Sequence, residues 1–124
     1  MKARNDALFI YDIVECCKKI EAYLSGADRR SFDANPMMQD AIVRNLEIIG
    51  EAAKRLSRSS RDGAPEIEWR EIMRMRDKIA HHYFRIDLDT VWQTTKSDVP
   101  VLAEALARLE LASFGSADSD QSSD

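Results

Sequence analysis

NPMMQDAIVRNLEIIGEAAKRL, residues 35–56, is a stretch in which apolar side chains recur every three or four positions. This spacing is typical of one face of an α-helix, here formed by Ile42, Leu46, Ile49, Ala53 and Leu56. An asparagine followed by a proline is a common helix start, with the asparagine as N-cap. Gly50 costs about 1 kcal/mol relative to alanine in a helix interior, so it indicates a close approach by a neighbouring helix.

Three further helical patterns flank this segment. Residues 2–24 repeat apolar positions at steps of three and four and end at Ser25-Gly26. After a polar loop at 57–65, residues 66–83 form another helical pattern with an apolar face. The last helical pattern begins at Leu88. The apolar positions are Phe9, Ile13, Cys16, Ile20 and Tyr23, then Ile72, Met75 and Ile79, then Leu88, Trp92, Thr95, Val99, Leu102, Leu106 and Leu109. The sequence predicts an all-α, antiparallel four-helix bundle, with Pro100 bending or breaking the last helix.

The chain of 124 residues is long enough for one domain. We assign residues 1–114 to the helical domain and residues 115–124, which are small and acidic, to a disordered tail. No apolar run reaches the roughly 18 residues of a membrane span, and no signal peptide is evident. We therefore expect a cytoplasmic protein without membrane contact.

Composition limits the kinds of site and ligand that the chain is expected to have. Cys16 and Cys17 are adjacent in a helical pattern, so they point in different directions, and we expect both to be reduced. No cluster has the spacing of metal ligands, so neither a metal nor another cofactor is expected. A net charge of −4 argues against a broad surface that coats nucleic acid. A small basic cleft is still compatible with the uneven placement of Arg44, Lys54, Arg55, Arg70, Arg74, Arg76 and Lys78.

RDKIAHHY, residues 76–83, brings together side chains suited to phosphate chemistry. Arg76 is a permanent cation, His81 can exchange protons near neutral pH, and Tyr83 carries a modifiable phenol. Both histidines of the chain lie here. Each residue taken alone has an ordinary structural explanation, such as a surface ion pair or a helix-end aromatic.

The spacing places these residues on different sides of a helix. Arg76 and Tyr83 lie about 60° and about 40° to one side of the core face, and Arg76 and His81 are about 140° apart. Asp77 falls on the polar face with His81. Either the helix is distorted or ends near His81, or residues from two copies converge in a two-fold dimer. We favour the homodimer.

The surrounding sequence resembles a known family. RNLEIIGEAA at 44–53, Trp69, MRDKIAHHYF at 75–84 and Val91-Trp92 are similar to the HepT-like branch of the HEPN superfamily, from the first helix to about Leu109. That resemblance implies a homodimeric RNase toxin with an R-x4-6-H motif from each protomer in a shared cleft. Arg76 and His81 match the motif, and Asp77 matches the polar residue that commonly follows the arginine.

The resemblance also implies a partner. In this family the antitoxin is a minimal nucleotidyltransferase that silences the toxin by attaching AMP to a tyrosine, which Tyr83 matches. The implied substrate is RNA, with transfer RNA as a reasonable guess and messenger RNA as the alternative. We expect His81 to transfer protons, Arg76 to hold the scissile phosphate, and Asp77 to orient His81 or carry water.

Two other readings use the same residues. The chain could be a non-catalytic helical dimer that binds a nucleotidyltransferase partner or a nucleotide. It could also be a purely structural bundle in which the motif is solvated surface. Loss of RNA cleavage on substitution of Arg76 or His81 separates the enzyme from both.

Overall fold

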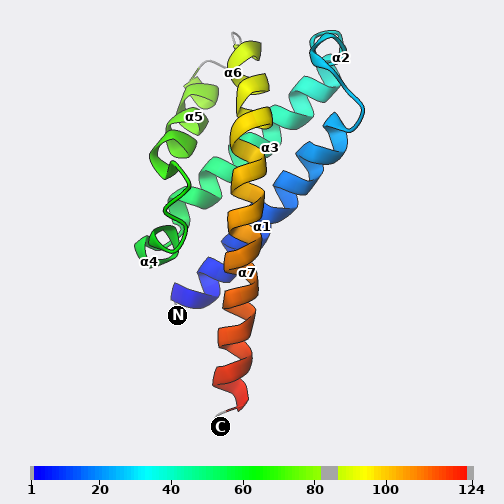
Figure 1. Ribbon diagram of the computed structural model, residues 1–124. Coiled ribbons are helices and arrows are strands. Elements are labelled where there is room, and N and C mark those ends of the chain that lie inside the picture. Colours follow the sequence, from blue (N-terminus) through cyan, green and yellow to red (C-terminus); the bar gives the residue numbers. More distant parts are fainter. Residues whose placement is uncertain (1, 82–86, 123–124) are drawn as a thin grey trace.

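The computed structural model describes residues 2–81 and 87–122, and of residues 2–5, 80–81 and 113–122 the backbone alone. Its described residues form helices and connecting turns (Figure 1), which confirms the prediction of an all-α fold. The elements are α1 Lys2–Leu24, α2 Arg29–Asp33, α3 Pro36–Arg55, α4 Arg58–Asp62, α5 Trp69–His81, α6 Leu88–Gln93, the π-helical η1 Thr94–Asp98, and α7 Val99–Ser122.

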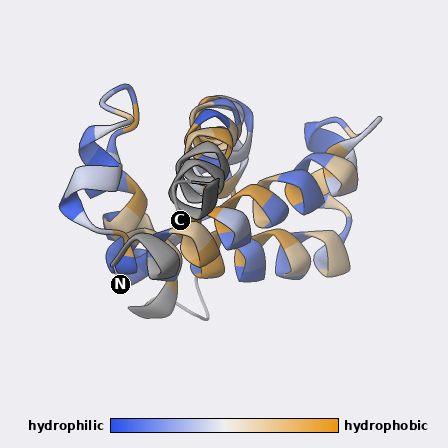
Figure 2. Cartoon of the chain, turned by 90° about the horizontal axis from the view of Figure 1, so that it is seen from below, coloured by the Kyte–Doolittle hydropathy of each residue, from blue (hydrophilic) through white to orange (hydrophobic). Residues whose placement is uncertain are grey.

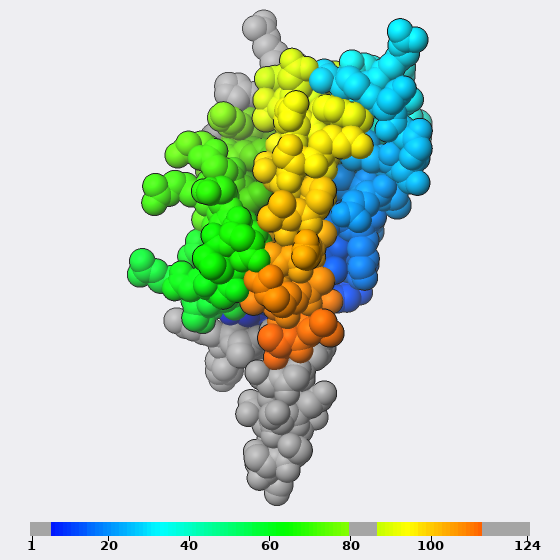
Figure 3. All heavy atoms as spheres, viewed as in Figure 1, coloured from blue at the N-terminus to red at the C-terminus, as the bar shows by residue number. Residues whose placement is uncertain are grey.

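The long elements form the predicted antiparallel four-helix bundle. Figure 1 shows α1, α3, α5 and the continuous run α6–η1–α7 alternating in direction. Helix α1 packs against both α3 and α7, and α3 also packs against α5. On the face shown in Figure 3, α7 lies between α1 and the segment that contains α4 and α5. The predicted homodimer stays a prediction.

The core lies between these helices and is built largely from the predicted stripes. The five apolar positions expected on α3 are all buried, as are the three expected on α5. The long helices carry both hydrophobic and hydrophilic residues (Figure 2), as amphipathic helices do. On α1 the predicted face is partly wrong, because Tyr23 is 39% exposed and Phe9 only half-buried, while Ile10 and Cys17 are fully buried.

Two short helices were not predicted: α2 lies between α1 and α3, and α4 lies in the predicted polar loop at 57–65. Asp28 accepts a hydrogen bond from the Ser31 backbone N–H at 2.8 Å and caps α2. The Ser57 hydroxyl caps α4 by accepting from the Ser60 N–H at 3.2 Å. The same short polar side chains favour turns and helix N-caps alike, so composition alone does not separate the two.

The Asn35 cap of α3 is confirmed, since its side chain accepts from the Met38 N–H at 3.0 Å. Helix α5 begins at Trp69, three residues later than predicted. The Trp69 indole donates to the carbonyls of Arg61 and Ala64 at 3.0 and 3.2 Å, which ties the start of α5 to α4. Buried Asp6 of α1 ties the start of α4 to α1. It accepts from the Ser57 N–H at 3.0 Å and from the Ser60 hydroxyl at 2.6 Å.

Pro100 neither breaks the last helix nor leaves it regular. The five residues before α7 form a π-turn, and the Val99 N–H bonds the Thr94 carbonyl. A proline has no N–H and crowds the carbonyl four residues back, so a wider turn relieves both problems. The backbone of α7 then continues to Ser122, past the predicted domain boundary at residue 114, and projects beyond the bundle (Figure 1). Disorder of the acidic tail stays a prediction.

Within the described ranges, none of the helices combines the length and the apolar character needed to cross a membrane.

The environment of the two cysteines yields a testable prediction. Both lie buried on α1 as free thiols. Burial raises the pKa of Cys16, and burial together with the neighbouring Cys16 raises the pKa of Cys17 to about 12. Because the thiolate is the nucleophile, Ellman's reagent at pH 8 should react slowly with the folded protein and rapidly with both thiols in guanidinium. Fast reaction of the folded protein would contradict the packing of α1.

Candidate functional site

The arginine of the R-x4-H motif lies where α5 meets α3. A Cβ atom added to Gly50 would be 2.2 Å from Arg76 Cβ and 2.7 Å from Arg76 Cγ. Real Cβ atoms do not come this close, so only glycine allows the stem of Arg76 to lie against the α3 backbone. The close helix approach that the sequence predicts at Gly50 is confirmed, and its partner is Arg76.

Five charged side chains surround this contact, and we call them the charged cluster: Glu51, Lys54, Arg55, Arg76 and Asp77. Arg76 Nη2 lies 3.1 Å from Glu51 Oε2, and Arg76 Nη1 lies 3.4 Å from Asp77 Oδ1. Lys54 Nζ donates to Asp77 Oδ1 at 2.7 Å. Arg55 Nε lies 3.4 Å from the other Glu51 oxygen. The cluster therefore links α3 to α5 through alternating charges.

The charge and exposure of the cluster suit an anionic ligand. Three cations and two carboxylates leave it with a net charge of +1. The Arg76 side chain is 33% exposed, so its guanidinium is reachable from solvent while its stem is held against Gly50. Ion pairs this exposed contribute at most about 1 kcal/mol each, so they fix side-chain geometry more than they stabilise the fold.

Asp77 has a contact partner on the neighbouring helix. An isolated helix places it on the polar face with His81, but Lys54 reaches across from α3 and binds it. The Lys54 hydrogen bond is the main cause that lowers the pKa of Asp77, with a smaller contribution from Arg76. A helical wheel omits side chains from the neighbouring helix, so it does not predict this contact. The contacts described for Asp77 thus relate it to Arg76.

The remaining motif residues are described less fully. His81 is the last residue of α5 as described, and only its backbone is placed. The structure therefore brings Arg76 and Asp77 together but leaves the distance from Arg76 to the His81 imidazole undefined. Tyr83 lies outside the described residues.

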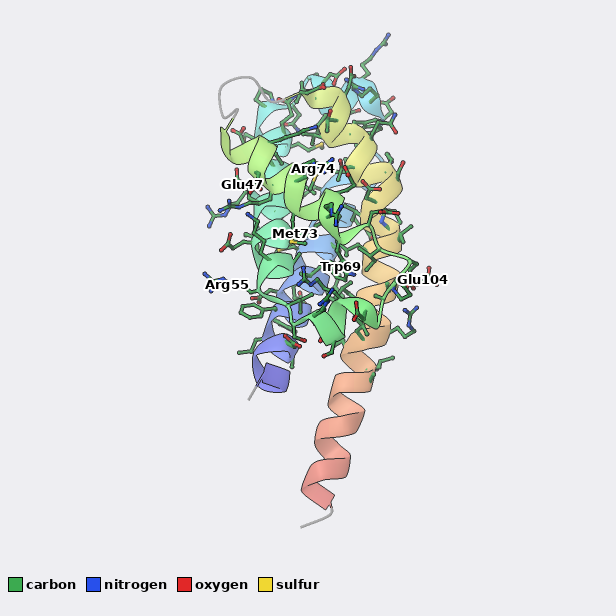
Figure 4. All side chains as sticks on the ribbon, turned by 90° about the vertical axis from the view of Figure 1, so that its left-hand side faces the viewer. Glu47, Arg55, Trp69, Met73, Arg74 and Glu104 are labelled. Carbon is green, nitrogen blue, oxygen red and sulfur yellow. The ribbon has the colours of Figure 1, made fainter. Side chains whose placement is uncertain are left out.

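Sequence reasoning did not single out the α3 members of the cluster. The sequence marks Lys54 and Arg55 only as basic residues and Glu51 only as part of the RNLEIIGEAA segment. The position of Lys54 holds a usable signal, because four places after Gly50 is about 40° away on an ideal helix, whereas Glu51 and Arg55 lie about 100° and about 140° away. Figure 4 shows Arg55, together with Glu47 one turn before Glu51, projecting from the same side of α3.

A cavity of about 360 Å³ opens on another side of α5, between α5, α6 and η1. Its apolar lining comes from Ile72, Met75, Ile79 and Val91, and Arg76 is not among the residues around it. Burial and nearby Glu71 raise the pKa of Asp98 at its edge. Because the cavity does not include the motif arginine, the charged cluster is the better candidate site.

Comparison with known proteins identifies the family of this chain. A model of the family described as ribonuclease HepT-like matches residues 13–109, which include all of α3, α5 and the charged cluster. The chain therefore belongs to the ribonuclease HepT-like family.

Individual relatives match along most of their length. The chain is 39% identical over 106 residues to a probable ribonuclease HepT from Thermococcus cleftensis, covering 86% of this chain and 96% of the relative. It is 35% identical over 109 residues to a putative RNase from Methanocaldococcus jannaschii, covering 88% and 90%. A putative RNase from Caldanaerobacter subterraneus is 32% identical over 101 residues, covering 82% and 90%. A search of solved structures gave no significant match.

The Lys54–Asp77 contact gives a prediction about pH. Asp77 has a lowered pKa in the folded protein, so its contribution to stability is present above its unfolded pKa and is lost as the pH falls through the folded value. In Lys54→Met the pKa of Asp77 should rise toward its ordinary value, measured by NMR titration of the carboxyl carbon. Lys18→Met, which removes an ion pair with Glu15 on α1, is the control and should leave Asp77 unchanged. An unaltered titration in Lys54→Met would exclude the contact.

Proposed function

We propose that this ribonuclease HepT-like chain is a metal-independent endoribonuclease in which Arg76 and His81 carry the chemistry. The observation that supports it most is the arginine itself. Its stem is packed against Gly50, its guanidinium is partly exposed, and it belongs to a cluster with a net positive charge. A guanidinium presented in this way can bind a phosphate through two N–H donors.

The reaction is attack by the 2′-hydroxyl of RNA on the adjacent phosphorus. A new O2′–P bond forms and the P–O5′ bond breaks, which leaves a 2′,3′-cyclic phosphate and a 5′-hydroxyl end. One proton leaves the 2′-hydroxyl and one reaches the departing 5′-oxygen. A histidine with a pKa near 6.5 can perform either transfer at neutral pH, and His81 takes that role.

Arg76 stabilises the charge that develops on the non-bridging oxygens during this attack. Asp77 has a supporting role, and its contact with Arg76 suits a role in holding the guanidinium. Removal of one preorganised donor of this kind typically lowers the rate by about 100- to 1000-fold.

The assembly and regulation follow the family pattern. Two copies would form a homodimer whose shared cleft receives Arg76 and His81 from each protomer. The chain would act as the toxin of a toxin–antitoxin pair, with RNA, such as transfer RNA, as substrate. A minimal nucleotidyltransferase antitoxin would silence it by AMPylation of Tyr83, because an added phosphate competes for Arg76 and the adenosine fills the cleft.

The test is cleavage of total RNA by purified protein in EDTA. Intact mass first establishes that Tyr83 is unmodified. The wild type should give discrete cuts with cyclic-phosphate ends, and His81→Ala and Arg76→Ala should each lose at least about 100-fold in rate. Cuts that persist in His81→Ala would move the chemistry elsewhere. Cutting that requires added Mg²⁺ would refute metal independence, and no cutting at all would favour the non-catalytic dimer.

A further inference from the structure

Glu51 connects two arginines with one carboxylate. Its Oε2 lies 3.1 Å from Arg76 Nη2 and its Oε1 lies in the same ion pair network, 3.4 Å from Arg55 Nε. The Arg55 guanidinium carbon is in turn 5.9 Å from the centre of the Phe9 ring. Glu51 follows Gly50 directly, so the residue that admits Arg76 and the residue that binds its guanidinium are neighbours on α3.

The contacts of Arg76 leave part of its guanidinium unused. A guanidinium has five N–H donors. The ion pairs with Glu51 and Asp77 use one contact at each terminal nitrogen. Within the part of the chain that the structure describes, donors therefore stay available for phosphate oxygens while both carboxylates are still bound.

An arginine side chain loses much rotational freedom when it is fixed by a ligand. If protein contacts fix it beforehand, that cost is not added to the barrier of the reaction, and the guanidinium already lies where charge develops. Gly50 determines the position of the Arg76 stem. Glu51 is the residue on α3 that contacts the guanidinium itself.

We propose that Glu51 is a positioning residue, which holds the Arg76 guanidinium in the orientation that binds the scissile phosphate. This proposal rests on the function proposed above for its kinetic consequence, whereas its structural consequence is independent of catalysis. The opposite model is that Glu51 competes with phosphate and blocks Arg76. The two models predict opposite changes in the cleavage rate when Glu51 is removed. Removal of a competitor speeds cleavage, and removal of a positioning residue slows it.

The test compares Glu51→Ala, Glu51→Gln and Glu47→Ala. Glutamine keeps an oxygen that accepts from Arg76 but carries no charge. Glu47 lies four residues before Glu51 on α3 and projects from the side of α3 that carries Arg55 (Figure 4). In the described part of the chain no ion pair joins it to Arg76, so it is the matched control. Single-turnover cleavage, binding of a 2′-O-methyl RNA that cannot be cut, and the NMR order parameter of Arg76 Nε–H are measured for each.

Glu51→Ala should cleave about 10- to 100-fold more slowly, the loss expected for a displaced catalytic group. Binding of the 2′-O-methyl RNA should change by less than about threefold, since cations nearby still attract the backbone. The Arg76 Nε–H order parameter should fall. Glu51→Gln should recover most of the rate, and Glu47→Ala should match the wild type.

Each contrary result has a defined meaning. Faster cleavage or tighter RNA binding by Glu51→Ala would overturn the proposal in favour of the competitor. An unchanged Arg76 order parameter in Glu51→Ala would overturn it whatever the activity. If the wild type does not cut RNA but Arg76 becomes mobile in Glu51→Ala, then the proposed nuclease function fails and the positioning role of Glu51 stands.

Discussion

Gly50 leaves no side chain between α3 and α5, and this gap determines where Arg76 can lie. A Cβ atom on α3 would come within 2.2 Å of Arg76 Cβ. The two backbones are therefore close enough for Glu51 and Lys54 to reach the charged residues of α5. Glycine is a poor helix former, so helix propensity does not explain its presence in the middle of α3. The close packing against Arg76 does.

The close packing at Gly50 places the charged cluster at the edge of the helix pair α3 and α5. Apolar faces bring α3 and α5 together, with Ile49 and Ile79 both buried in the core. The polar edge of the same pair of helices then carries the charged cluster. Since exposed ion pairs contribute little stability, the cluster adds little to the packing of the two helices, and its main effect is on the side-chain geometry of Arg76.

The sequence predicts the bundle well because each long helix has its own periodic apolar face, and the α3 stripe is buried as expected. It also predicts that a helix approaches Gly50. It does not predict Glu51 or Lys54 as partners of Arg76 and Asp77, because those pairs join residues 25 and 23 positions apart on different helices. It misses α2 and α4 because Asp28 and Ser57 favour both turns and helix caps.

The most direct test is the free energy of unfolding of Gly50→Ala in urea, at the same protein concentration as the wild type. Alanine favours a helix by about 1 kcal/mol, but the clash with Arg76 Cβ cannot be relieved by a side-chain rotation. We expect a net loss of about 1 to 2 kcal/mol. Gly63→Ala is the control, because its added Cβ would lie 3.2 Å from both Leu109 Cδ2 and the Ser60 carbonyl oxygen, contacts that shifts of a few tenths of an ångström relieve. A Gly50→Ala protein that is more stable than the wild type, as helix propensity alone requires, would contradict the close packing of α3 against Arg76.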